Sequence, residues 1–106
     1  MKLGIIISTN EIEAIWNAFR LANFSKKEGD VVKVFLTAKA VDYEDASSEK
    51  FPAKNEAEKF LSSGGIILAC TTCIKSRNRQ GDALCPLSNM RELHNIIKES
   101  DKVVCY

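Results

Sequence analysis

Two cysteines three residues apart, Cys70 and Cys73, are the residues of this chain best suited to chemistry. A C-x-x-C pair can close a disulfide, bind a metal, or hold a persulfide beside a resolving thiol. Three cations follow at Lys75, Arg77 and Arg79, and positive charge favours the thiolate, which is the reactive form of cysteine. The pattern therefore indicates a thiol site, against the plainer interpretation that Cys70 is a small buried residue.

The residues around the pair, and the number of possible metal ligands in the chain, limit which of these reactions the pair can carry out. Thioredoxin-type oxidoreductases carry Trp before the pair and Gly-Pro within it, whereas here Ala69 precedes the pair and Thr71-Thr72 lie within it. This difference weakens the hypothesis of a thioredoxin-type oxidoreductase. A structural zinc site needs about four ligands. The candidate ligands are Cys70, Cys73, Cys85 and either His94 or Cys105. Because no second C-x-x-C is present, we expect no resident metal and keep a cysteine metal site as an alternative.

The elements that must position these cysteines follow from the hydrophobic pattern. Short apolar runs with the composition of strands span residues 3–8, 31–36, 66–69 and 102–105. Apolar residues recur at helical spacing between them, over residues 12–22, 57–61 and 90–97. Unbroken apolar runs are typical of strands buried on both faces, and alternation with helices predicts a parallel sheet with helices on both faces. The sequence thus predicts an α/β fold with Cys70 at the end of the third strand.

The predicted helix starts and the region between them complete this outline. Asn10, with Glu13 three residues on, suits the N-cap of the first helix, and Ser88 suits the N-cap of the last. Residues 37–54 are less regular, with a polar stretch over 42–50, and predict a surface excursion with a short helical turn at 38–41.

The loop after the first strand is a second candidate for the site. Ligands of open parallel sheets bind at the carboxyl ends of strands, so we expect Ser8, Thr9 and Asn10 to lie near Cys70 and support it. This loop lacks the pattern of a phosphate-binding loop or a G-x-G-x-x-G turn. We therefore expect neither a nucleotide nor a flavin, and no cofactor at all.

The bulk properties limit the possible function. The 106 residues fit a single domain, 1–106, with 45% hydrophobic and 27% charged residues and a formal net charge of +1. This near-neutral balance gives no reason to expect a nucleic acid or membrane partner, and no apolar run approaches the roughly 18 residues of a membrane span. We expect a cytoplasmic protein whose four cysteines are kept reduced.

The chain resembles the DsrE-like sulfur-relay family, and within it the small YchN-like single-domain members. The resemblance covers nearly the whole length. It rests on the opening apolar strand, Asn17-Ala18-Phe19-Arg20-Leu21-Ala22, Val34-Phe35-Leu36, Cys70-x-x-Cys73-x-x-x-Arg77 and Ser100-Asp101-Lys102-Val103-Val104. The sequence departs from the family at Asn78, where the family has Gly after the arginine.

The resemblance implies a flavodoxin-like α/β fold and a sulfur-handling function. Cys70 matches the cysteine that accepts and transfers persulfide sulfur in the relay members, and Cys73 matches the second thiol of the small members. Sulfur donor and acceptor proteins are the implied partners, and a trimer or hexamer is the implied assembly. Small size points to a homo-oligomer too, because a short chain buries a smaller fraction of its unfolded surface than a larger domain does. A thiol/disulfide redox switch and a metal-stabilised structural oligomer remain the alternatives.

Overall fold

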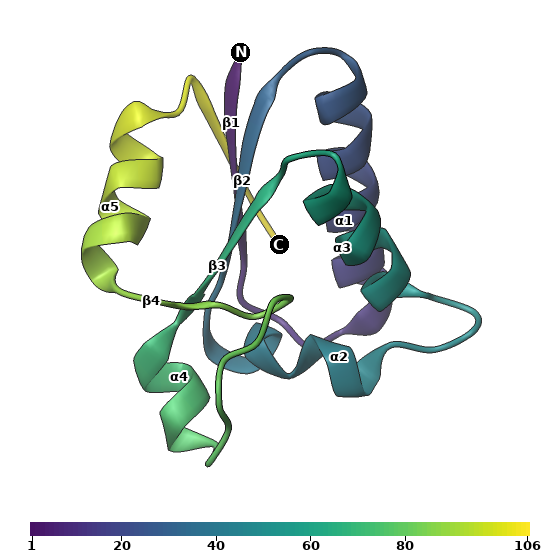
Figure 1. Ribbon diagram of the computed structural model, residues 1–106, viewed down its shortest axis with the longest axis vertical. Coiled ribbons are helices and arrows are strands. Elements are labelled where there is room, and N and C mark those ends of the chain that lie inside the picture. The colour runs from purple at the N-terminus through teal and green to yellow at the C-terminus, as the bar shows by residue number, and fades with distance from the viewer.

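A five-stranded parallel sheet forms the centre of the computed structural model, which describes residues 1–106 (Figure 1). The strands are β1 Lys2–Ile7, β2 Val31–Leu36, β3 Ile66–Cys70, β4 Leu87–Ser88 and β5 Lys102–Cys105. Their order in the sheet is β4-β3-β2-β1-β5, and every neighbouring pair runs parallel. The predicted α/β class is confirmed.

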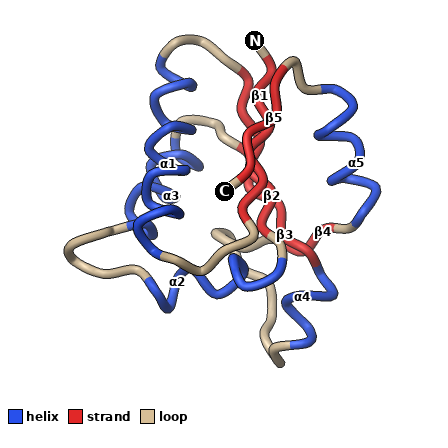
Figure 2. Tube along the Cα trace, turned by 180° about the vertical axis from the view of Figure 1, so that it is seen from behind, coloured by secondary structure: helices blue, strands red, loops and turns tan.

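Helices cover both faces of this sheet, as the crossover rule requires. One face is covered by α1 Ile12–Lys27 and α3 Ala53–Ser62, and the other by α5 Met90–Glu99 (Figures 1 and 2). The short elements η1 Ala38–Asp42 and α2 Tyr43–Ala46 follow β2, and α4 Thr71–Ser76 follows β3. None of these helices is both long and apolar enough to cross a bilayer.

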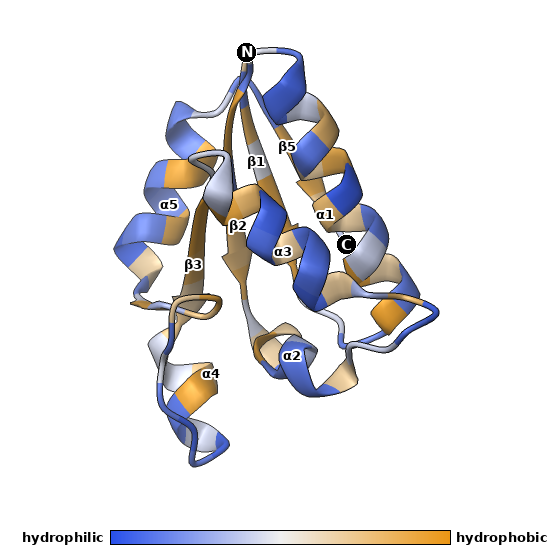
Figure 3. Ribbon diagram, turned by 45° about the vertical axis from the view of Figure 1, so that its right-hand side comes forward, coloured by the Kyte–Doolittle hydropathy of each residue, from blue (hydrophilic) through white to orange (hydrophobic).

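The main core lies between the sheet and the pair α1 and α3. Alternate residues of the central strands point into it, among them Ile5, Val34 and Ile67, while the polar faces of the helices point outward (Figure 3). A smaller cluster on the α5 side joins Phe35, Cys70 and Ile96. The third strand therefore ends with its cysteine in the smaller, less covered apolar layer.

Both predicted helix starts were wrong by one residue. Glu11 is the N-cap of α1, and its carboxylate accepts hydrogen bonds from the backbone N–H groups of Glu13 and Ala14. Asn89 is the N-cap of α5, and its side chain accepts from the Glu92 N–H. In each case the neighbouring residue can accept the same bonds, so local sequence alone does not choose between them.

The segment predicted as a surface excursion contributes to the core instead. Residues 38–46 form η1 and α2, in which Ala40, Val41 and Tyr43 are buried. The Tyr43 ring packs against Phe19, 5.4 Å between centroids, and its hydroxyl donates to the Leu84 carbonyl at 2.8 Å. This contact fastens the loop before β4 to the segment after β2, and both segments border the cysteine pair.

The two-residue strand β4 was not predicted, because Leu87-Ser88 is too short to show a pattern. It pairs Leu87 with Ala69 and Ser88 with Cys70, so it lies only along the last two residues of β3. In a parallel pair, residues in register point to the same face, so Ser88 lies beside Cys70 on the α5 side.

Candidate functional site

The cysteine pair lies where the chain leaves neighbouring strands in opposite directions. After β2 it turns toward the side of α1 and α3, into η1, and after β3 it turns toward the side of α5, into α4 (Figures 1 and 2). Such a divergence at the carboxyl ends of parallel strands is the usual position of a binding site in α/β proteins. Cys70 ends β3, and Cys73 lies within α4.

Cys73 is held by donors from the segment after β2. The Ala38 backbone N–H donates to the Cys73 Sγ at 3.2 Å, and the Thr37 Oγ1 lies 3.7 Å from the same sulfur. The neighbouring Cys70 side chain also lowers the pKa of Cys73. Partial burial raises the pKa of the Cys73 thiol, but these hydrogen bonds and the charge of Arg77 outweigh it, so the pKa lies below its ordinary value. The site therefore favours a thiolate at Cys73.

The donor at Ala38 depends on an unusual backbone conformation. Ala38 has a φ of 51°, in the left-handed region that residues other than glycine rarely adopt. Such a conformation costs of the order of ~1 kcal/mol and persists only where the surrounding structure imposes it. Here the conformation coincides with the hydrogen bond from the Ala38 N–H to the Cys73 sulfur.

Cys70 has a more enclosed environment than Cys73. It is 9% exposed, against the partial burial of Cys73, and it packs with Phe35 and Ile96. Its neighbour in β4, Ser88, is 8% exposed, and the Ser88 Oγ is a buried hydroxyl without a hydrogen-bond partner. The Ser88 carbonyl accepts from the Thr71 Oγ1 at 2.5 Å, which secures the backbone of β4 and leaves only the side chain unpaired.

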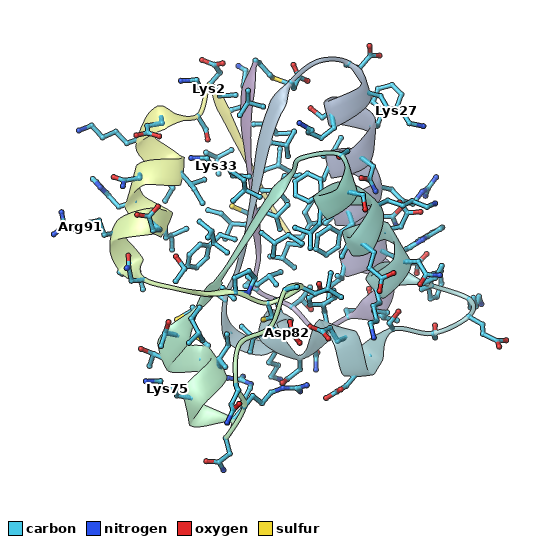
Figure 4. All side chains as sticks on the ribbon, viewed as in Figure 1. Lys2, Lys27, Lys33, Lys75, Asp82 and Arg91 are labelled. Atoms are coloured by element: carbon cyan, nitrogen blue, oxygen red, sulfur yellow. The ribbon has the colours of Figure 1, made fainter.

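The three predicted cations differ in their relation to the pair. The Arg77 Nη1 donates to the Cys73 carbonyl at 3.0 Å, and its Nε donates to the Asp42 carboxylate at 3.0 Å. Arg79 binds Asp42 at 2.9 Å and Asp45 at 2.5 Å. Lys75 is exposed on α4 and points away from the sheet (Figure 4). Arg77 thus adjoins the pair, with its charge and that of Arg79 partly balanced by carboxylates.

The loop expected beside Cys70 makes its hydrogen bonds elsewhere. The Ser8 Oγ donates to the Tyr106 carbonyl at 3.2 Å, beyond the end of β5, and the Thr9 Oγ1 accepts from the Glu11 N–H. Asn10 is exposed. Because β2 lies between β1 and β3, the neighbour of the cysteines is the segment after β2, and no hydrogen bond joins Ser8, Thr9 or Asn10 to them.

The other two cysteines are separate from the pair. Cys85 is buried, its Sγ contacts the Val41 carbonyl at 3.7 Å, and burial raises its pKa to about 12, so it stays a protonated thiol. Cys105 is exposed at the end of β5. No group of three or more His, Cys, Asp or Glu side chains is placed to hold a metal ion, so the alternative of a cysteine metal site has no ligand set within one chain.

Several residues of the site could not be found from sequence. Ala38 acts through an unusual backbone conformation, and Thr37 through a side chain that only the fold brings to Cys73. Ser88 acts through a strand of two residues, and Asp42 through ion pairs to residues 35 and 37 positions away in the sequence. The only local signal for any of them was the predicted helical turn at 38–41, which the 3₁₀ helix confirms.

Asp82, in the loop after α4, lies close enough to Glu44 of α2 to affect the pKa of Glu44. Desolvation, together with a hydrogen bond and charge repulsion from Asp82, raises the pKa of Glu44 to about 7. Asp82 is itself bound through its Oδ1 to the N–H groups of Leu84 and Cys85. A protonated Glu44 can donate a hydrogen bond to the Asp82 carboxylate, whereas an ionised Glu44 repels it.

The stability of the protein should therefore fall as pH rises through neutrality. A carboxyl group whose pKa is raised by folding stabilises the folded state below its unfolded pKa of ~4.3, and that contribution is lost as pH rises through about 7. We expect the thermal midpoint to drop between pH 5 and pH 8 by roughly 2 °C more in the wild type than in Glu44→Gln, since solvent screens this partly exposed group. Glu49→Gln, an exposed control, should behave as the wild type, and equal drops in all three proteins would contradict the proton-mediated contact.

Comparisons with known proteins agree with this architecture. YchN from E. coli superimposes with a TM-score of 0.82 over 100% of both chains, at 20% sequence identity. The fold is that of YchN. A conserved protein of unknown function from Bacteroides thetaiotaomicron superimposes with a TM-score of 0.79 over 99% of this chain and 94% of that one, at 20% identity. No family model matches the sequence, and no curated protein matches it.

The structural match bears on the resemblance noted in the sequence. It confirms the flavodoxin-like, DsrE-like fold over the whole chain, and at this identity it establishes the fold alone. Asn78 stands where the family has Gly. Its φ is 55°, so it adopts the left-handed conformation that glycine favours and asparagine tolerates. The turn after α4 is thus compatible with the substitution.

Proposed function

We propose that this protein handles sulfur, accepting persulfide sulfur and transferring it, with Cys70 as the carrier and Cys73 as the second thiol. The observation that carries the proposal is the hydrogen-bonded environment of the pair. The sulfur of one thiol accepts a hydrogen bond from the Ala38 N–H, which lowers its pKa and favours the thiolate, and the other lies next to it in an apolar layer. A thiolate is required to attack a sulfur donor, and an enclosed position protects a persulfide from oxidation. We place this chemistry in the cytoplasm, where thiols are kept reduced.

Mass spectrometry of the reduced protein tests this function. The wild type is incubated with a cysteine desulfurase and cysteine, or with sodium tetrasulfide, and then alkylated. We expect a mass increase of one sulfur atom on the peptide that contains the pair, and none in a Cys70→Ser/Cys73→Ser double variant. Folded, reduced wild-type protein that gains no sulfur from either donor would rule the function out.

A thiol/disulfide switch is the second candidate, favoured by the closeness of the two cysteines, since Cys73 packs against the apolar cluster that contains Cys70. Its signature is a reversible Cys70–Cys73 disulfide. Equilibration with glutathione buffers distinguishes the two functions: a switch should be oxidised at a poise near ~-180 mV, whereas a pair that stays reduced there would exclude this candidate.

We further propose that the protein is a homo-oligomer, a trimer or hexamer, that acts with separate sulfur donor and acceptor proteins. Support comes from apolar side chains left uncovered on and before α5: Leu87 is 50% exposed, Met90 68% and Ile97 50%. Met90 and Ile97 are seven residues apart and therefore share one face of the helix. A small chain gains stability by covering such a face in a closed ring.

Light scattering coupled to size-exclusion chromatography checks this assembly. The wild type should have three or six times the mass of one chain, and Met90→Glu/Ile97→Glu should shift it to smaller species. Arg91→Gln provides a matched control, because Arg91 lies on the same helix and points into solvent (Figure 4). A wild type that is monomeric at micromolar concentration would contradict the proposal.

A further inference from the structure

The unpaired hydroxyl of Ser88 and the unequal environments of the two cysteines are features that the proposed function leaves unexplained. We propose, building on that function, that the two thiols are used in a fixed order: Cys73 takes sulfur from a small persulfide or polysulfide donor, and Cys70 stores it beside the Ser88 hydroxyl. Cys73 is thereby the attacking residue, and Ser88 is a positioning residue for the stored sulfur.

The first step follows from access and from hydrogen bonding. Cys73 is partly exposed and Cys70 is buried, so a donor meets Cys73 first. The Ala38 N–H, 3.2 Å from the Cys73 Sγ, and the Thr37 hydroxyl, 3.7 Å from it, stabilise negative charge on that sulfur. The same two donors stabilise Cys73 when it later departs as a thiolate.

Each chemical step conserves atoms and electrons. The Cys73 thiolate attacks the outer sulfur of the donor R–S–SH, a bond forms between the Cys73 Sγ and that sulfur, the S–S bond of the donor breaks, and R–S⁻ leaves. The Cys70 thiol then loses its proton to solvent and attacks the same outer sulfur, the bond to Cys73 breaks, and Cys73 departs as a thiolate. The sulfur atom has moved twice without any oxidant.

The storage step explains the orphaned hydroxyl. A buried hydroxyl without a partner costs stability, and natural structures contain few of them. Ser88 is paired in register with Cys70 and lies on the same face of the sheet, yet its Oγ makes no hydrogen bond in the reduced, sulfur-free protein. A second sulfur on Cys70 extends toward β4 and gives this hydroxyl an acceptor.

Rapid-quench mass spectrometry with sodium tetrasulfide or glutathione persulfide tests the order of use. In the wild type, added sulfur should appear first on Cys73 and later on Cys70. Cys73→Ser should load Cys70 at least about tenfold more slowly, and Cys70→Ser should load Cys73 at the wild-type rate but pass nothing on. Cys105→Ser, exposed and away from the pair, is the control.

The outcomes separate this order from the function itself. Wild-type protein that gains no sulfur contradicts the proposed function, whereas Cys73→Ser that loads Cys70 as fast as the wild type overturns only the order. Sulfide release with formation of a Cys70–Cys73 disulfide means that Cys70 attacked the inner sulfur, which overturns storage. The wild-type time course reports the order even where a variant fails to fold.

Ser88→Ala tests the storage side independently. Because the Ser88 Oγ has no partner to lose, the thermal midpoint should stay the same or rise, while the half-life of sulfur on Cys70 should shorten several-fold. Ser62→Ala, an exposed serine on α3, should leave both quantities unchanged. An unchanged half-life in Ser88→Ala would overturn the role of this residue.

Discussion

Iodoacetamide at pH 7 is expected to alkylate Cys73 of the folded protein at least about thirty times faster than Cys85. The pKa of Cys73 lies below its ordinary value of ~8.5, and burial raises that of Cys85 to about 12. The thiolate fractions therefore differ by at least about three orders of magnitude. Roughly half of this difference, on a logarithmic scale, is offset because a thiolate of lower pKa is a weaker nucleophile. Mass spectrometry of quenched time points measures both rates.

Two substitutions identify the source of this selectivity. Thr37→Val removes a hydroxyl near the Cys73 sulfur and should lower the rate at Cys73 near neutral pH. Ala38→Gly retains the backbone N–H that donates to the sulfur and suits the φ of 51°, so it should keep the selectivity and raise stability slightly. Equal alkylation of Cys73 and Cys85, or faster alkylation of Cys70, would contradict the thiolate assignment.

Replacing Tyr43 should destabilise the protein more than any change at the cysteines. Its side chain is fully buried against Phe19, so Tyr43→Ala should lower the free energy of unfolding by about 3–5 kcal/mol. Tyr43→Phe keeps the ring and removes only the hydrogen bond to the buried Leu84 carbonyl, which should cost about 1–3 kcal/mol because that acceptor is left unpaired.

Urea denaturation followed by circular dichroism measures both effects. Tyr106→Phe is the matched control, because the Tyr106 side chain makes no hydrogen bond and its backbone bonds are unaffected. We expect this control to change stability by less than about 0.5 kcal/mol. A Tyr43→Phe protein as stable as the wild type would show that the Leu84 carbonyl does not depend on this hydroxyl.

The sheet could be predicted because its signals are local. Strands such as Ile66–Cys70 are apolar runs bounded by glycine or polar residues, and the helices between them show their apolar spacing directly. The position of Cys70 at the end of a strand, with Cys73 one helical turn later, follows from the same pattern. The helix caps were predicted one residue off because adjacent side chains offer equivalent acceptors.

The partners of the cysteines could not be predicted because they are set by tertiary structure. The order of the strands places η1, and not the Ser8–Asn10 loop, beside the pair. The left-handed backbone at Ala38 is invisible in a residue type that almost always avoids it. The ion pairs of Arg77 and Arg79 with Asp42 span a large sequence separation, so the sequence suggested free cations where the structure has two arginines whose charges are partly balanced by carboxylates.

The shortness of β4 determines how the protein can move. Its ladder joins β3 at only two residue pairs, whereas β1, β2 and β3 are joined along most of their length. Segments with few contacts open at a fraction of the free energy of global unfolding. Detachment of Leu87 and Ser88, with Leu84 and Cys85 still packed in the main core, would uncover Cys70 while the three central strands stay paired. The rate at which this segment opens therefore determines how often the buried thiol becomes accessible, independently of global unfolding. Hydrogen exchange of its backbone amides measures that rate.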